Sequence, residues 1–126
     1  MLNFREFEAG PDPFGRKFQV LFQWLQTAIS LRNADAVDVK FTVVDESGAR
    51  TAKTIALPLA DLSRASAAAG RQMDDAWCAR LAGLHLRRVV ETGEDMEKEL
   101  VTVSPADLAR HAAEVARLER PEAHAG

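Results

Sequence analysis

Apolar and polar side chains alternate with a period of two between residues 36 and 45, in the stretch AVDVKFTVVD. A period of two places successive side chains on opposite faces of a β-strand, so this segment is predicted to be a half-exposed antiparallel strand. The positions on its apolar side are Val37, Val39, Phe41 and Val43. A turn at Ser47-Gly48 and a second alternating run at residues 51–57, closed by Pro58, predict a partner strand. The first half of the chain is therefore expected to be a β-meander.

The preceding segment, residues 17–31, fits two periods at once. Phe18, Val20, Phe22 and Trp24 alternate as on a strand, whereas Phe18, Leu21, Phe22, Leu25 and Ile29 fit one face of a helix. The density of aromatic and β-branched residues favours a strand, with a hairpin turn at residues 33–35. The apolar phase shifts between Trp24 and Leu25, which predicts a β-bulge there or a strand buried on both faces. If residues 17–31 were a helix, the sheet would shrink to two or three strands.

The second half has helical signals. Helices are predicted at residues 59–70, 74–91 and 104–119, because Gly70 and Thr92-Gly93 resemble helix ends and Ser104 with Pro105 resembles a helix start. Residues 1–10 and 99–103 are predicted to be short edge strands, the first followed by a turn at residues 10–15. The expected fold is α+β, an antiparallel meander of three to four strands with a possible late edge strand, packed on one face by two to three helices. We expect one domain at residues 1–120 and a flexible tail at 121–126.

Composition narrows the class of protein. A chain of 126 residues with 47% hydrophobic and 28% charged residues is typical of one globular domain. The chain has no apolar run long enough to span a membrane and does not begin like a signal peptide, so we expect a cytoplasmic protein that binds no membrane. A net charge of -3 argues against nucleic-acid binding. Twelve arginines against four lysines, with abundant alanine, suggest a bacterial source.

The long predicted helix carries Cys78, the only cysteine, and His85 on its apolar arc. Seven residues span about 10.5 Å along a helix, so these two side chains cannot form a catalytic dyad. Cys78 is predicted to be a small core residue. His85 needs a hydrogen-bond partner and is predicted to be a satisfied core or interface histidine. In the alternative, His85 lines a ligand cavity between helix and sheet, with Arg88 holding an anion and Trp24 as aromatic lining.

Two further groups of residues resemble binding sites only weakly. His111 and Glu114 are three apart on the last helix, a spacing that can bind a metal, but other carboxylates would be needed. We interpret them as a solvated pair at the border between the apolar stripe and the polar face of this helix, and no metal or cofactor is predicted. The acidic segment ETGEDMEKE is interpreted as an exposed connection that a basic partner could recognise. Its carboxylates are Glu91, Glu94, Asp95, Glu97 and Glu99.

The common nucleotide-binding, hydrolase and zinc-protease motifs are absent from the sequence, which argues against an enzyme. Three hypotheses remain. The first is a non-catalytic interaction or regulatory module, expected to be a homodimer because the supply of apolar residues is generous for one core. The second is a small-molecule or enzymatic pocket at His85. The third is an inhibitor-like or immunity-like protein that binds its partner through the acidic segment.

Overall fold

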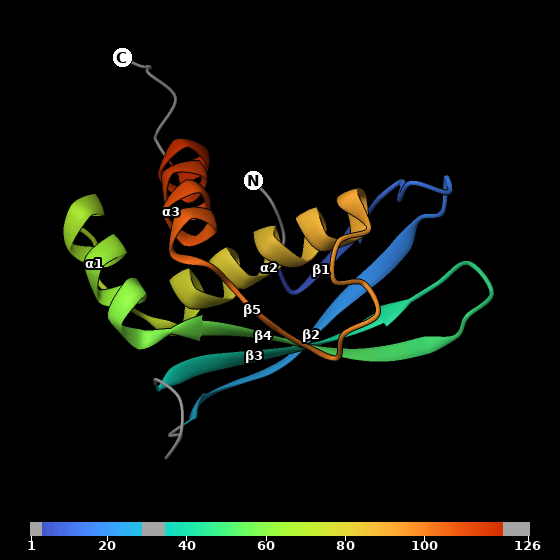
Figure 1. Cartoon of the computed structure of the whole chain (residues 1–126), viewed down its shortest axis with the longest axis horizontal. Helices are drawn as coiled ribbons and strands as arrows, with labels where there is room; N and C mark the ends of the chain where they lie inside the picture. The colour runs from blue at the N-terminus through green and yellow to red at the C-terminus, as the bar shows by residue number, and fades with distance from the viewer. Residues whose placement is uncertain (1–3, 29–34, 120–126) are drawn as a thin grey trace.

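The computed structural model of the protein describes residues 4–28 and 35–119. It has an α+β fold in which five strands form one sheet and three helices gather on one face of that sheet (Figure 1). The strands are β1 (Glu6–Ala9), β2 (Phe18–Ala28), β3 (Ala36–Val44), β4 (Arg50–Pro58) and β5 (Leu100–Thr102). The helices are α1 (Leu59–Ala69), α2 (Asp75–Thr92) and α3 (Pro105–Glu119). The predicted class is confirmed, with slightly more strands than predicted.

The strands follow one another across the sheet in the order β1-β2-β3-β4-β5. The first four form the predicted antiparallel meander. β5 pairs parallel to β4, because α1 and α2 carry the chain back across the sheet before it re-enters at the edge. The predicted turn at residues 33–35, apart from Asp35, and the predicted tail at 121–126 lie outside the described residues.

The ambiguous segment is a strand with a bulge, so the helical alternative for residues 17–31 is wrong over its described part. The register with β3 shifts between Phe22 and Trp24, one step before the predicted position, which leaves Gln23 as the extra residue. Phe22 lies opposite Phe41, whose side chain is in the core, whereas Trp24 lies opposite Lys40 on the other face. The bulge explains the two superimposed periods, because the apolar side chains keep facing the helices on both sides of it.

α2 is the centre of the core. It packs against the sheet on one side and α3 on another, and β1 crosses it closely. Gly83 permits this crossing, since a Cβ atom there would lie 3.2 Å from the ring of Phe4. The buried residues of the helix are Trp77, Cys78, Leu81, Ala82, Gly83, Leu84, His85, Leu86, Val89 and Val90. The apolar surplus that the sequence suggested is thus taken up largely inside the fold.

The helix ends agree with the predicted signals. The Asp74 side chain accepts a hydrogen bond of 2.8 Å from a backbone amide in the first turn of α2. Gly70 and Gly93 end α1 and α2 in the left-handed conformation that favours glycine. The Ser104 hydroxyl accepts a hydrogen bond of 3.2 Å from the amide of Asp107 at the start of α3. These local contacts confirm the predicted ends of α1 and α2 and the predicted starts of α2 and α3.

Candidate functional sites

Cys78 lies in the core, as predicted. Its side chain is 3% exposed and forms no disulfide. Burial raises the pKa of the thiol to about 11, and the nearby carboxylates of Asp75 and Asp74 act in the same direction. Because the thiolate is the reactive form of cysteine, this residue is not an activated nucleophile at neutral pH.

His85 and His111 form a buried pair between α2 and α3. The Nδ1 atom of His85 lies 3.0 Å from the Nε2 atom of His111, and the rings meet edge to face with centroids 5.2 Å apart. His85 is therefore a satisfied core histidine, as predicted. The interpretation of His111 as a solvated boundary residue is wrong, since it is 6% exposed. It lies at the edge of the apolar stripe of α3, and the packing of α3 on α2 covers that edge.

The pair is uncharged at neutral pH. Burial lowers the pKa of His85, and burial followed by the neighbouring His85 ring lowers the pKa of His111 to about 4. Two neutral imidazoles can share one N–H···N hydrogen bond, whereas two imidazolium ions would each need an acceptor. A shared bond therefore requires that at least one ring stay neutral.

A cleft of about 240 Å³ opens beside this pair, between α2 and α3. Its lining residues are Leu84, Arg87, Arg88, Glu91, Thr92, Arg110, His111 and Glu114. Of the predicted ligand-binding residues, Arg88 lines the cleft and His85 lies behind His111. No pattern in the sequence indicates that His111 and Arg110 join them, because that contact depends on how two separate helices pack.

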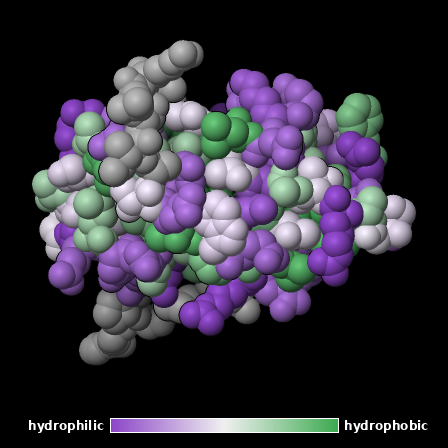
Figure 2. All heavy atoms as spheres, turned by 90° about the horizontal axis from the view of Figure 1, so that it is seen from below, coloured by the Kyte–Doolittle hydropathy of each residue, from purple (hydrophilic) through white to green (hydrophobic). Residues whose placement is uncertain are grey.

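Trp24 does not join these residues, because it lies on the face of the sheet without helices. Its side chain is exposed, and the Lys40 ammonium lies 5.7 Å from the centre of its ring. Leu100 lies on the same row across the sheet, and polar residues of β3 and β4 separate the two. Figure 2, which views the molecule from this side, shows hydrophobic residues scattered among hydrophilic ones. Such scattered exposure is normal for a protein surface.

The acidic segment forms the connection between α2 and β5. Beneath it lies Lys53, which is 3% exposed and donates hydrogen bonds to the carbonyl oxygens of Met96 and, at 2.6 Å, of Lys98. Burial lowers the pKa of Lys53, and the charges of Glu97 and Glu99 oppose that effect. Within the described ranges, no three His, Cys, Asp or Glu side chains are grouped to hold a metal ion. Recognition of a partner by this segment stays a prediction.

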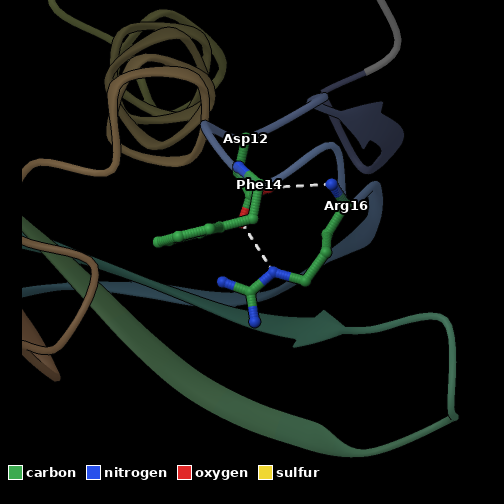
Figure 3. Close-up of polar contacts among 3 residues, drawn as sticks. All are labelled: Asp12, Phe14 and Arg16. Carbon is green, nitrogen blue, oxygen red and sulfur yellow. Dashed lines mark hydrogen bonds and ion pairs between the residues drawn. The ribbon is translucent and has the colours of Figure 1, made fainter.

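The loop at residues 10–17, interpreted from sequence only as a turn, displays an exposed aromatic ring (Figure 3). Phe14 is 81% exposed, whereas Asp12 in the same loop is 6% exposed. The Asp12 carboxylate accepts hydrogen bonds from the amides of Phe14 at 2.9 Å and Arg16 at 2.8 Å, and from Nε of Arg16 at 2.8 Å. The Arg16 guanidinium lies 5.3 Å from the centre of the Phe14 ring.

The charge state of Asp12 follows from these contacts. Burial acts to raise the pKa of Asp12, but the hydrogen bonds from Arg16 and Phe14 outweigh it and the pKa is lowered. Asp12 is therefore ionised at neutral pH and holds the loop as a charged acceptor. The signal in the sequence was an aromatic residue between proline and glycine, two positions after an aspartate.

No family model, no curated protein and no solved structure matches this chain. In the part of the chain that the structure describes, no helix combines the length and the hydrophobicity needed to cross a membrane.

Proposed function

We propose that the protein is a non-catalytic interaction module that forms a homodimer through the loop at residues 10–17, with Phe14 as the anchor. One observation carries this proposal. The Phe14 side chain is exposed to water, whereas the Asp12 carboxylate in the same loop is buried and accepts hydrogen bonds from the amides of Phe14 and Arg16.

The energetic reason is the cost of leaving Phe14 in water. Full burial of a phenylalanine side chain contributes about 1.5–3 kcal/mol relative to its exposed state. Aromatic residues dominate protein interfaces, and an anchor that is already ordered loses less conformational entropy on binding. Asp12 fixes the backbone at Phe14 and Arg16, so the ring is presented in a defined place before any partner arrives.

A second copy of the chain is the partner we propose. In a twofold symmetric dimer the same surface serves both sides, so one exposed ring per chain supplies both halves of the contact. The Asp12 carboxylate and the Arg16 guanidinium form an ion pair at 2.8 Å, which balances the charge beneath the ring. Two such loops can therefore approach with little repulsion from this pair.

The non-catalytic part of the proposal is supported by the chemistry of the groups that could act in catalysis. The thiol of Cys78 is buried and its pKa is raised to about 11. His85 and His111 bond to each other, and neither ring bonds to a serine, threonine or cysteine side chain among the described residues. Neither arrangement resembles an activated nucleophile with its base.

Site-specific photo-crosslinking tests the interface. Position 14 receives the photoreactive analogue p-benzoylphenylalanine, and a control protein receives it at Met73, another exposed hydrophobic position. Irradiation of the purified protein should give a covalent dimer from position 14 and little from position 73. Adding Asp12→Ala to the position 14 variant should reduce the yield, because the loop loses its brace. Equal yields from both positions, or none from position 14, would contradict the proposal.

A further inference from the structure

The α2–α3 cleft concentrates arginine side chains. Arg87 and Arg88 come from neighbouring positions of α2, and Arg110 reaches the same cleft from α3. Neighbouring positions of a helix point about 100° apart, so Arg87 and Arg88 leave α2 in different directions. Because α3 packs against α2 on this side, the side chains of Arg87 and Arg88 both line the cleft between the two helices.

Ion pairs use up part of the charge around the cleft. Arg110 pairs with Asp107, and Nε of Arg117 donates to Glu114 at 3.1 Å. Both pairs join residues three apart on α3. The α3 side of the cleft therefore carries positive and negative groups whose charges nearly cancel.

Arg87 and Arg88 differ from these arginines, because neither forms an ion pair with any residue that the structure describes. Glu91, on the same helix, is likewise without an ion pair within the described ranges. The α2 side thus offers two guanidinium groups against one carboxylate.

We propose that this cleft is a binding site for a small oxyanion, a carboxylate or a phosphate, held by the guanidinium groups of Arg87 and Arg88 next to the ring of His111. A planar guanidinium matches the geometry of both oxyanions through paired N–H donors. Arg88 is half-buried, so its hydrogen bonds to a ligand are less exposed to water than those of a surface arginine. The inference is independent of the dimer interface.

The size and the rim of the cleft limit the ligand. A volume of about 240 Å³ is below the range of drug-sized ligands, which suits a small metabolite or an inorganic ion. Glu91 and Glu114 line the same space and would repel a long polyanion such as nucleic acid. The arrangement therefore favours a compact ligand with one or two negative charges.

Binding should be linked to proton uptake by the histidine pair. The charged groups that face the two rings are Arg88, Asp95, Asp107, Arg110 and Glu114. An anion beside His111 adds negative charge to this set and favours the protonated ring, which raises the pKa of His111 in the complex. For an anion of fixed charge, affinity should therefore increase as the pH falls through the raised pKa of His111 in the complex.

Titrations of the full chain followed by NMR test the site, with inorganic phosphate and with succinate as probes. Each anion is added up to about 50 mM, and saturable shifts are expected for amides of residues 84–92 and 107–114. Arg88→Gln should raise the dissociation constant about tenfold, because the ligand loses one charge-assisted hydrogen bond. Arg50→Gln, which removes the same charge at a distant exposed position, should change it by less than about twofold.

Saturable shifts with either probe, weakened by Arg88→Gln and not by Arg50→Gln, would support the site. The probe that binds more tightly shows whether the site prefers a phosphate or a carboxylate. The absence of saturable shifts with both probes would overturn the proposal. An equal loss from Arg88→Gln and Arg50→Gln would overturn it too, because it would indicate screening by bulk charge. The ring resonances of His111 in the wild-type protein give a second readout, since its pKa should rise when the anion is bound.

Discussion

At the scale of single residues, Lys53 places an ammonium group inside the fold, where it holds the connection between α2 and β5 by two backbone carbonyls. Lys53→Met should lower the free energy of unfolding by about 1–3 kcal/mol, because both carbonyls lose their donor in a buried site. Urea unfolding measures this loss. Arg50→Met, at an exposed position outside the loop at residues 10–17, is the control and should stay within about 0.5 kcal/mol of the wild type.

Cys78 should be protected from thiol reagents in the folded protein. Its burial and its pKa of about 11 leave almost no accessible thiolate at neutral pH. Labelling by a chromogenic disulfide should therefore occur only at the rate at which the protein unfolds, and at once in denaturant. Rapid labelling under native conditions would show that α2 opens locally or that the side chain is more accessible than its packing indicates.

The residue scale also shows the limit of sequence reasoning for the site. Periodicity placed Cys78 and His85 on the buried face of a helix, and the need of an imidazole for a partner was correctly inferred. The identity of that partner, His111, depends on how α3 packs against α2, because the two histidines are 26 positions apart in sequence. The exposure of Phe14 was missed, because a turn signal says where the chain bends and not which side chain stays in water.

At the scale of elements, the bulge in β2 predicts that one residue of this strand can be deleted without changing the pairing of the sheet. Removing Gln23 should keep every cross-strand pair, since Phe22 already faces Phe41 and Trp24 already faces Lys40. The deletion should change the free energy of unfolding by about 1 kcal/mol or less. Removing Thr42 from the unbulged β3 is the contrast. It reverses the faces of the side chains that follow and should unfold the domain, as circular dichroism would show.

The contact between α2 and α3 should weaken in acid. In the folded chain His111 takes up a proton only near pH 4, whereas in the unfolded chain it does so below its ordinary pKa of 6.5. The unfolded state therefore binds more protons within this window, and stability falls as the pH falls through it. The loss assigned to His111 should be on the order of 1–2 kcal/mol once solvent screening is allowed for.

Denaturant unfolding across this pH window, with His111→Gln as the comparison, measures the effect. Glutamine keeps a hydrogen-bonding side chain beside His85 but does not titrate, so the variant should lose much of the slope. Parallel pH profiles for the two proteins would assign the acid sensitivity to other groups. Asp107, Arg88 and Arg110 face His85 in both proteins and contribute to its pKa in each.

At the scale of the whole molecule, local signals were sufficient for the layers of the fold. Alternation in β3 and the helix-capping residues Asp74, Gly93 and Ser104 predicted which elements form, and one apolar face per element predicted that the helices cover one side of the sheet. The parallel entry of β5 and the cleft between α2 and α3 depend on packing between distant segments. A pattern within one element carries no information about those contacts.

The native mass of the protein in solution tests the central proposal most directly. Sedimentation velocity at about 100 µM should give a wild-type species of twice the 13.8 kDa chain mass. Phe14→Ser should give the single-chain mass with an unchanged circular dichroism spectrum, and Met73→Ser should remain a dimer. A wild-type protein that sediments as a single chain, or a Phe14→Ser variant that stays dimeric, would contradict the proposal that Phe14 anchors a homodimer.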